Sequence, residues 1–256
     1  MPKDHESAVP PVSSTKNTLR VLMLLEDHPS LRVVDVSKEL GVAGSTAHRL
    51  LTSLKDEGFL RQPPGSRLYV AGPQILRLAR HFSDQNSLER VAHVHLERLC
   101  KQVNEAVNLQ VLVGHEVLCL DSVVEDRHGL QVRSIRGQRV SASVSAAGKV
   151  LLAALKPSDL EESLAQDPRH PDPDWAATVH AELATIREFG YATNMGEREP
   201  GVHAVAVPVN DTSGRPIAAL AVAAPSVRLP HIRVNGLINH LRTASAAIAL
   251  DYYGSA

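Results

Sequence analysis

The stretch AGSTAHRLLTSLKDEGFLRQ, residues 43–62, carries two different kinds of side chain at helical spacing. One face of the helix would hold Ala47, Leu50, Leu51 and Leu54. The other face has hydroxyls, an imidazole and a guanidinium where carboxylates and lysines are usual: Ser45, Thr46, His48, Arg49, Thr52 and Ser53. Such groups suit the edges of bases, because a major groove admits one α-helix and a guanidinium can bond guanine through two N–H groups.

Three neighbouring elements would position this helix. A first helix is expected from Asn17 to just before Pro29, and RVVDVSKELG predicts a second, with Gly41 as its C-terminal stop. Helix, short turn and helix form a helix-turn-helix. FLRQPPGSRLYVAG then predicts two short strands around a Pro-Pro-Gly-Ser tip, so residues 15–72 read as a mainly α, winged helix-turn-helix domain. Four side chains are expected where backbone phosphates would run: Lys55, Arg61, Arg67 and Tyr69.

The rest of the chain divides into an arm, a connector and a second domain. Residues 1–14 read as a disordered arm, 73–86 as a linker helix, and 87–256 as an α+β domain. Strands are expected in AVNLQVLVG, EVLCLDSVV, GLQVRSI, YATNM, VHAVAVPV and PIAALAVAA. Helices are expected in LERVAHVHLERLCKQVN, SAAGKVLLAAL, DWAATVHAELATIREFGY and IRVNGLINHLRTASAAIALDYY.

Composition limits the function classes. The net charge is −1, but residues 1–82 hold 11 Lys and Arg against 8 Asp and Glu, whereas 83–256 hold 16 against 20. This mild asymmetry favours a nucleic-acid contact at the N-terminal end. The apolar runs are too short to span a bilayer and no signal peptide is evident, so a cytoplasmic location is expected. The 2 cysteines fit a reducing compartment.

No catalytic or metal-binding constellation is found in the sequence. Cys100 and Cys119 fall at apolar positions and are expected to be packed thiols. His93 and His95 are two apart on a helix and therefore diverge, so they cannot hold one ion. No catalytic residue, metal or cofactor is predicted. Two alternatives to a DNA-binding regulator remain: a GAF-like small-molecule enzyme with an accessory winged domain, and a protein–protein adaptor.

The segments GVAGSTAHRLLTSLKDEGFL and YVAGPQILRLAR resemble the helix-turn-helix and linker of IclR-type transcriptional regulators. GKVLLAAL and REFGYATNMGEREPGVHAVAVPVNDTSGRPIAALAVAAPSVRL resemble the family's GAF-like effector-binding domain, and the likeness covers roughly residues 17–250. Two residues depart from the family pattern. Arg32 replaces the usual Ser or Thr cap of the second helix, and Gly44 replaces a basic or polar residue at the turn.

The segment SVSAAGKVLLA places small residues at the start of a helix, where free N–H groups favour an anion such as a carboxylate. Close packing of helix on sheet explains the same residues equally well. The resemblance implies a pocket for a small organic acid at the positions matching Val132, Val140, Ala146, Ala147, Asn194 and Ala204. Nearby polar candidates are Ser143, Ser145 and His203, while Glu199 is expected in a solvated turn.

The function implied is that of a ligand-responsive repressor. Two winged domains of a homodimer would bind a pseudo-palindromic double-stranded DNA operator, with recognition helices about 34–36 Å apart. The C-terminal domains would pair dimers into a tetramer and sense a small carboxylate. The effector would act by favouring one spacing of the two helices.

Overall fold

The computed structural model describes residues 13–84, 88–124, 131–170 and 172–254. The chain divides into two compact units, Met1–Gln85 and Asn86–Ala256, and each has its own core. The expected arm lies outside the described residues as far as residue 12, but Ser13 and Ser14 already belong to the first helix. The helix therefore begins earlier than the sequence predicted.

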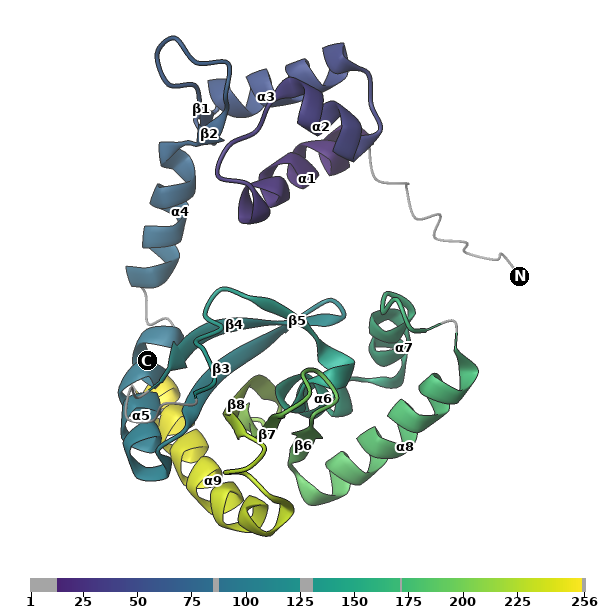
Figure 1. Ribbon diagram of the computed structural model, residues 1–256. Coiled ribbons are helices and arrows are strands. Elements are labelled where there is room, and N and C mark those ends of the chain that lie inside the picture. Colours follow the sequence, from purple (N-terminus) through teal and green to yellow (C-terminus); the bar gives the residue numbers. More distant parts are fainter. Residues whose placement is uncertain (1–12, 85–87, 125–130, 171, 255–256) are drawn as a thin grey trace, which may run out of the picture. The chain divides into compact units, whose positions relative to one another are not determined.

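The N-terminal unit is a helix-turn-helix followed by a hairpin and a further helix (Figure 1). Its elements are α1 (Ser13–Asp27), α2 (Val33–Leu40), α3 (Gly44–Asp56), β1 (Leu60–Arg61), β2 (Val70–Ala71) and α4 (Pro73–Asp84). The two strands are antiparallel, with Leu60 opposite Ala71 and Arg61 opposite Val70. The winged helix-turn-helix prediction is confirmed, although each strand is only 2 residues long.

The ends of α2 show how the turn is formed. Gly41 adopts the left-handed conformation, with φ 64°, and its N–H bonds the carbonyl of Lys38. An L side chain is strained in this region, so glycine ends the helix and turns the chain toward α3. At the other end Arg32 occupies the N-cap without a side-chain hydrogen bond, as its replacement of Ser or Thr predicted.

The C-terminal unit has a six-stranded antiparallel sheet in the order β5-β4-β3-β8-β7-β6. The strands are β3 (Ala106–Val113), β4 (Glu116–Val123), β5 (Arg139–Ser141), β6 (Ala192–Met195), β7 (Val202–Asn210) and β8 (Pro216–Pro225). The helices are α5 (Leu88–Val103), the 3-10 turn η1 (Ala142–Val144), α6 (Ala146–Ala153), α7 (Pro157–Ala165), α8 (Pro173–Phe189) and α9 (His231–Gly254). None of the described helices is both long and apolar enough to cross a bilayer.

Each face of the sheet packs on a different group of helices (Figure 1). On one face, Val107, Leu220 and Val205 pack with apolar residues of α5 and α9. On the other face, small residues such as Ala206, Ala219 and Ala221 meet α6 and α8. Because alanine leaves space above a sheet, α6 approaches closely, and all of its residues from Ala146 to Ala153 are buried.

Two expectations for this unit are corrected. GLQVRSI does not form a strand where it is described: residues 131–135 are irregular, and β5 at 139–141 pairs with β4 in their place. Helix α7 was not predicted, although Pro157 occupies its first turn, a favoured place for proline. The other predicted strands and helices are present, with small differences at their ends.

Candidate functional sites

The two faces of α3 separate as the sequence predicted. Leu51 and Ala47 are fully buried, and Leu50 and Leu54 are at most 7% exposed, so this face is fixed in the N-terminal core. The opposite face is accessible along the helix: Ser45, Thr46, His48, Arg49 and Ser53 are exposed, and Thr52 is half-buried. Within the described residues, the side chains of His48 and Arg49 form no hydrogen bond or ion pair, so both are available to a partner.

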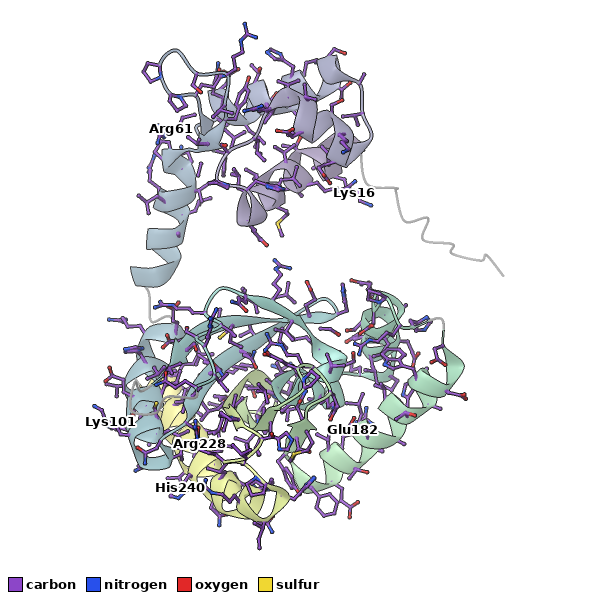
Figure 2. All side chains as sticks on the ribbon, in the orientation of Figure 1. Lys16, Arg61, Lys101, Glu182, Arg228 and His240 are labelled. Carbon is purple, nitrogen blue, oxygen red and sulfur yellow. The ribbon has the colours of Figure 1, made fainter. Side chains whose placement is uncertain are left out.

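The hairpin adds cations beside this face. Arg61 lies on β1 and Arg67 in the tip, and both are exposed; Figure 2 labels Arg61 at the hairpin. The tip turns at Gly65, where φ is 72°, and the hydroxyl of Ser66 accepts the N–H of Leu68 at 3.0 Å. Lys55 is half-buried near the end of α3. These three cations remain accessible, as a contact with phosphates requires.

Tyr69 does not have the surface position that was expected. Its residue is 3% exposed and belongs to the N-terminal core. Its backbone also pairs with Leu31 in both directions, at 2.8 and 2.9 Å. The aromatic ring is buried because it closes the core between the hairpin and the start of α2. The prediction that Tyr69 contacts phosphate is therefore corrected: it supports the hairpin from inside.

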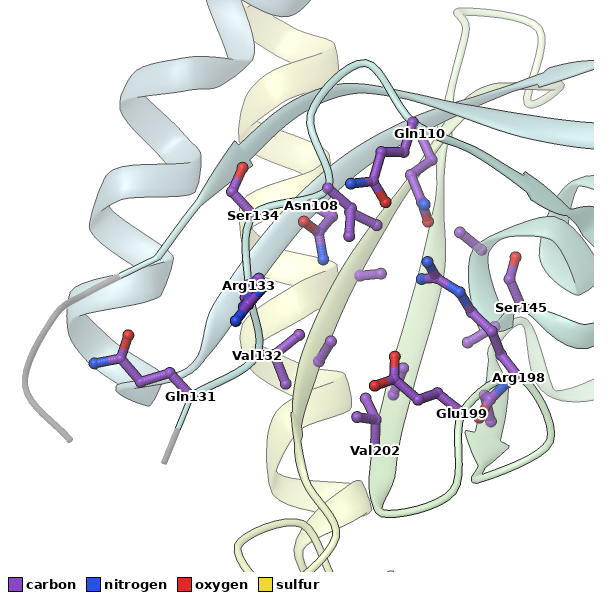
Figure 3. A pocket seen from close by; sticks show the side chains of 18 residues that line it. Asn108, Gln110, Gln131, Val132, Arg133, Ser134, Ser145, Arg198, Glu199 and Val202 are labelled. Carbon is purple, nitrogen blue, oxygen red and sulfur yellow. The ribbon is translucent and has the colours of Figure 1, made fainter. Parts of the chain in front are cut away.

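A cavity of about 360 Å³ lies on the face of the sheet that carries α6. Figure 3 shows its walls: the sheet, the N-terminus of α6, the segment before β5 and the loop before β7. Six of the nine residues expected around an effector line it: Val132, Ser145, Ala146, Ala147, Asn194 and Ala204. A cavity of this size suits a small molecule.

The start of α6 presents backbone donors to this cavity. Ser145 is the N-cap, and its hydroxyl accepts the N–H of Gly148 at 2.9 Å. The N–H groups of Ala146 and Ala147 precede the first intrahelical bond and have no acceptor in the described part of the chain. Unpaired N–H groups at a helix N-terminus favour an anion.

Asn194 lines the cavity, but its amide is already used by the protein. Its nitrogen donates to the carbonyl of Val144, and its oxygen accepts the N–H of Gly196 at 3.0 Å. The side chain thus ties β6 to the turn before α6 and to the loop that begins at residue 196. Asn194 shapes the wall, and these contacts use one of its two N–H groups and one of the two lone pairs of its oxygen.

The other three candidates do not line the cavity. Val140 packs in the core opposite Val117 of β4. The ring of His203 bonds the carbonyl of Leu229 at 2.8 Å. Ser143 donates to Asp167 at 2.6 Å, and Asp167 also accepts from Arg169. Burial alone would raise the pKa of Asp167, but these hydrogen bonds outweigh it and hold that pKa well below its usual range.

Several lining residues were not predicted. Asn108 and Gln110 are buried polar residues of β3 on the cavity side, and Arg133, Arg198 and Glu199 lie around its rim. Glu199 lies exposed in a turn, as the sequence suggested, and it also lines the cavity. The sequence could have pointed to Asn108 and Gln110 as site residues. They are two amides at alternate positions of an otherwise apolar predicted strand, so they share one face of the sheet.

The cysteines and the paired histidines are used in packing. Cys119 is 1% exposed and bonds the carbonyl of Asp121, and burial raises its pKa to about 12, so it stays a thiol at neutral pH. His93 meets Asp121 at 2.7 Å, whereas His95 meets Asp251 at 2.8 Å. The two histidines thus diverge toward different carboxylates, as their spacing on the helix predicted.

Comparison with known proteins gives this geometry a context. The family model described as "IclR helix-turn-helix domain" matches residues 14–64, and "Bacterial transcriptional regulator IclR C-terminal" matches residues 81–250. The chain belongs to the IclR family. Its predicted resemblance and its two-part fold are thereby confirmed.

Individual relatives agree with the family assignment. The transcriptional repressor IclR of Escherichia coli is 26% identical, over 98% of this chain and 95% of its own length. A crystal structure of an IclR transcriptional regulator from Silicibacter has a TM-score of 0.82 and 27% identity, covering 93% of this chain and 96% of that one. An IclR homologue from Microbacterium hydrocarbonoxydans, solved with 4-hydroxybenzoate, has a TM-score of 0.74 and 25% identity, covering 94% and 98%.

These relatives are transcriptional regulators, so the chain is an IclR-family transcriptional regulator with a DNA-binding and an effector-binding domain, and not an enzyme. The alternative of a GAF-like enzyme with an accessory winged domain is not supported.

Proposed function

We propose that this regulator represses its target by binding a pseudo-palindromic operator through α3 and the hairpin, and that a small carboxylate in the α6 cavity changes this affinity. The observation that carries the proposal is the exposed face of α3, which presents hydroxyls, His48 and Arg49 without a carboxylate until Asp56. Such a face can approach a polyanion closely and still form directional bonds to bases. The name of the repressor relative from Escherichia coli supports the repressing role.

Arg49→Ala is expected to lower operator affinity about 5- to 150-fold, because a bidentate contact to guanine contributes about 1–3 kcal/mol to discrimination. Fluorescence anisotropy with the upstream region of the protein's own gene, set against a scrambled duplex, measures the change. Weak binding to the scrambled duplex should be much less affected. Arg98→Ala, which removes an exposed arginine from α5 in the other unit, is the matched control. Equal operator affinity of Arg49→Ala and the unmodified chain would exclude α3 as the reading helix.

Pairing of two chains would fit the apolar residues left exposed in the N-terminal unit. Leu19 and Met23 are 59% and 46% exposed at i and i+4 of α1, and Leu76 and Leu78 of α4 are 54% and 47% exposed. A second copy covering such side chains would bring two recognition helices onto one duplex face. We propose a homodimer formed in this way, with dimers pairing through the C-terminal units. The mass of the operator complex by sedimentation tests this stoichiometry.

The cavity would receive the carboxylate at the N-terminus of α6. The donors are the N–H groups of Ala146 and Ala147, and the cations are Arg133 and Arg198. Among the described residues neither arginine forms an ion pair with a carboxylate. The 4-hydroxybenzoate complex of the Microbacterium homologue supports an organic acid as the class of ligand.

A series of polar contacts leads from the segment after the cavity wall to α5. Arg136, in the segment between the cavity wall and β5, pairs with Glu89 in the first turn of α5 and lies 3.9 Å from Asp121. Asp121 in turn bonds His93 of α5, and this hydrogen bond raises the pKa of His93. Ordering of residues 131–136 around an acid would therefore change what α5 contacts. We propose this route, continued by the linker at residues 73–86, as the transmitter of the effector signal.

Ala204→Leu is expected to leave operator binding intact and abolish its response to acids. Ala204 lines the cavity from β7 and is half-buried, so a leucine side chain would occupy space that the ligand needs. Operator binding is titrated with acetate, pyruvate, benzoate and 4-hydroxybenzoate in turn. Ala204→Ser, which adds a single oxygen, is the control and should still respond. A normal response in Ala204→Leu would place the acid site elsewhere.

A further inference from the structure

The cavity beside α6 continues a stripe of alanines on the sheet. Ala206, Ala219 and Ala221 belong to the core in which α6 packs on the sheet. Two further alanines follow on the same face: Ala204, two residues before Ala206 in β7, and Ala223, two residues after Ala221 in β8. They lie directly opposite each other, and both line the cavity. The apolar face of the sheet therefore extends from beneath α6 into the cavity.

The alanines make this part of the cavity floor low as well as apolar. Cβ atoms directly opposite each other on neighbouring strands lie about 5 Å apart, and alternate residues of one strand lie about 7 Å apart. Ala204, Ala221 and Ala223 thus cover an area of about the size of one six-membered ring, and their side chains end at Cβ. Beside them, β3 contributes the amides of Asn108 and Gln110.

Three larger apolar side chains border this floor and are accessible from the cavity. Val132 and Ile135 lie on the segment before β5, and Val202 lies at the start of β7; Figure 3 shows Val132 and Val202. Each of the three, like Ala204, is only half-buried. Apolar surface of this kind favours an apolar guest, because contact removes both surfaces from water. Acetate at the start of α6 would leave most of it wet in a cavity of about 360 Å³.

We propose that the effector is an aromatic carboxylate, with its ring on the alanine floor and its carboxylate at the start of α6. This inference rests on the proposed acid site and specifies its ligand class. A planar ring can contact a low floor with a whole face. It also has no internal rotation to lose on binding, whereas an aliphatic chain has several. Tenfold in affinity is about 1.4 kcal/mol, which burial of about 60 Å² of apolar surface provides.

Isothermal titration calorimetry on the full chain with acetate, benzoate and cyclohexanecarboxylate tests the proposal. We expect benzoate to bind about tenfold or more tightly than acetate, because only benzoate covers the floor. Cyclohexanecarboxylate has as many carbon atoms as benzoate but a puckered ring. It should bind more weakly than benzoate, because parts of a puckered ring are held away from a low floor and lose contact. Acetate or cyclohexanecarboxylate binding as tightly as benzoate would overturn the proposal.

Ala223→Val adds two methyl groups to the floor where the ring would lie. In this variant benzoate affinity should fall about tenfold or more, whereas acetate needs only the start of α6 and should stay within about twofold. Ala246→Val is the matched control, because Ala246 is an exposed alanine of α9 that lines a separate groove beside β7. Both acids should bind this control as they bind the unmodified chain.

Val202→Ala replaces Ala223→Val if the latter does not fold, since it removes apolar surface without adding volume. Benzoate affinity should then fall about three- to tenfold, with acetate affinity unchanged. A preference for benzoate that survives undiminished in the folded variant would overturn the alanine floor as the site of the ring and leave the acid site standing. Failure of all three acids to bind the unmodified chain would contradict the acid site itself.

Discussion

Replacing Glu182 and Glu197 together by glutamine is expected to lower the free energy of unfolding of the C-terminal unit by about 3 kcal/mol. The reason is Lys149, whose side chain is only 2% exposed in α6. Its ammonium donates to Glu182 of α8 at 2.7 Å, to the carbonyl of Thr193 at 3.3 Å, and to Glu197. With both carboxylates neutralised, a buried cation would remain without a counter-charge.

The size of this effect follows from the exposure of the partners. Glu182 and Glu197 are 38% and 41% exposed, so their own desolvation is modest, whereas that of Lys149 is almost complete. Removing the partners of a buried charge costs about 3–5 kcal/mol, and the amide oxygens of glutamine keep the loss at the lower end. For a unit of this size we expect the midpoint of thermal unfolding to fall by about 6–12 °C. Calorimetry or circular dichroism measures it.

Lys149→Met supplies the opposite control. Methionine keeps most of the volume and removes the buried charge, while Glu182 and Glu197 are left at a surface where water solvates them. This variant should be close to neutral in stability, because a buried ion pair replaced by an apolar side chain often costs nothing. An equal loss in both variants would show that the ion pairs of Lys149 themselves stabilise the unit, since both variants remove these pairs and only one leaves an unpaired buried charge.

The contacts of Lys149 with Glu182 and Glu197 also affect the cavity beside α6. Glu197 directly precedes Arg198 and Glu199, which line the cavity. Its bond to Lys149 therefore fastens the loop before β7 to α6, whose first residues also line the cavity. In the double variant we expect weaker acid binding as well as lower stability, whereas operator affinity without acid should change little because α3 belongs to the other unit.

The sequence predicted those parts of the molecule where local pattern and tertiary structure agree. The leucines of α3 recur at helical spacing, so the buried and exposed faces of the helix followed directly from the period. The turn at Gly41 followed from the left-handed conformation that glycine favours. The cavity residues at the start of α6 came from the family resemblance, and the structure adds their unpaired N–H groups.

Other features depend on contacts that no local pattern encodes. The segment GLQVRSI was expected to form a strand, yet residues 131–135 line the cavity, and β4 pairs with β5 only after the turn at Gly137. Tyr69 looks like a surface residue on a hairpin, but it is drawn into the core by its pairing with Leu31. A lysine within an apolar helix gives no sign that carboxylates of two distant segments will surround it, as they do Lys149.

Gly148→Ala is expected to destabilise the C-terminal unit by about 3 kcal/mol, near the upper end of the usual cost of overpacking. A Cβ atom at Gly148 would lie 2.2 Å from the carbonyl oxygen of Ala142 and 2.3 Å from its Cα. Both are backbone atoms of η1, which cannot rotate away as a side chain can. The glycine therefore lets η1 cross α6 at close range, so close packing explains this residue of the SAAGK stretch.

The displacement of η1 in Gly148→Ala should also affect the cavity, because Ser145 follows η1 directly and Ala146 and Ala147 form the first turn of α6. Separating η1 from α6 would move these donors and weaken binding of benzoate and 4-hydroxybenzoate, measured by calorimetry below the unfolding temperature.

Gly236→Ala is the control: Gly236 lies in α9, and a Cβ atom there would have no neighbour within 4 Å among the described residues outside its own helix turn. Alanine there should raise stability by up to about 1 kcal/mol, since it favours the helix more than glycine does. A Gly148→Ala chain as stable as Gly236→Ala would mean that η1 and α6 do not pack as closely as the structure shows.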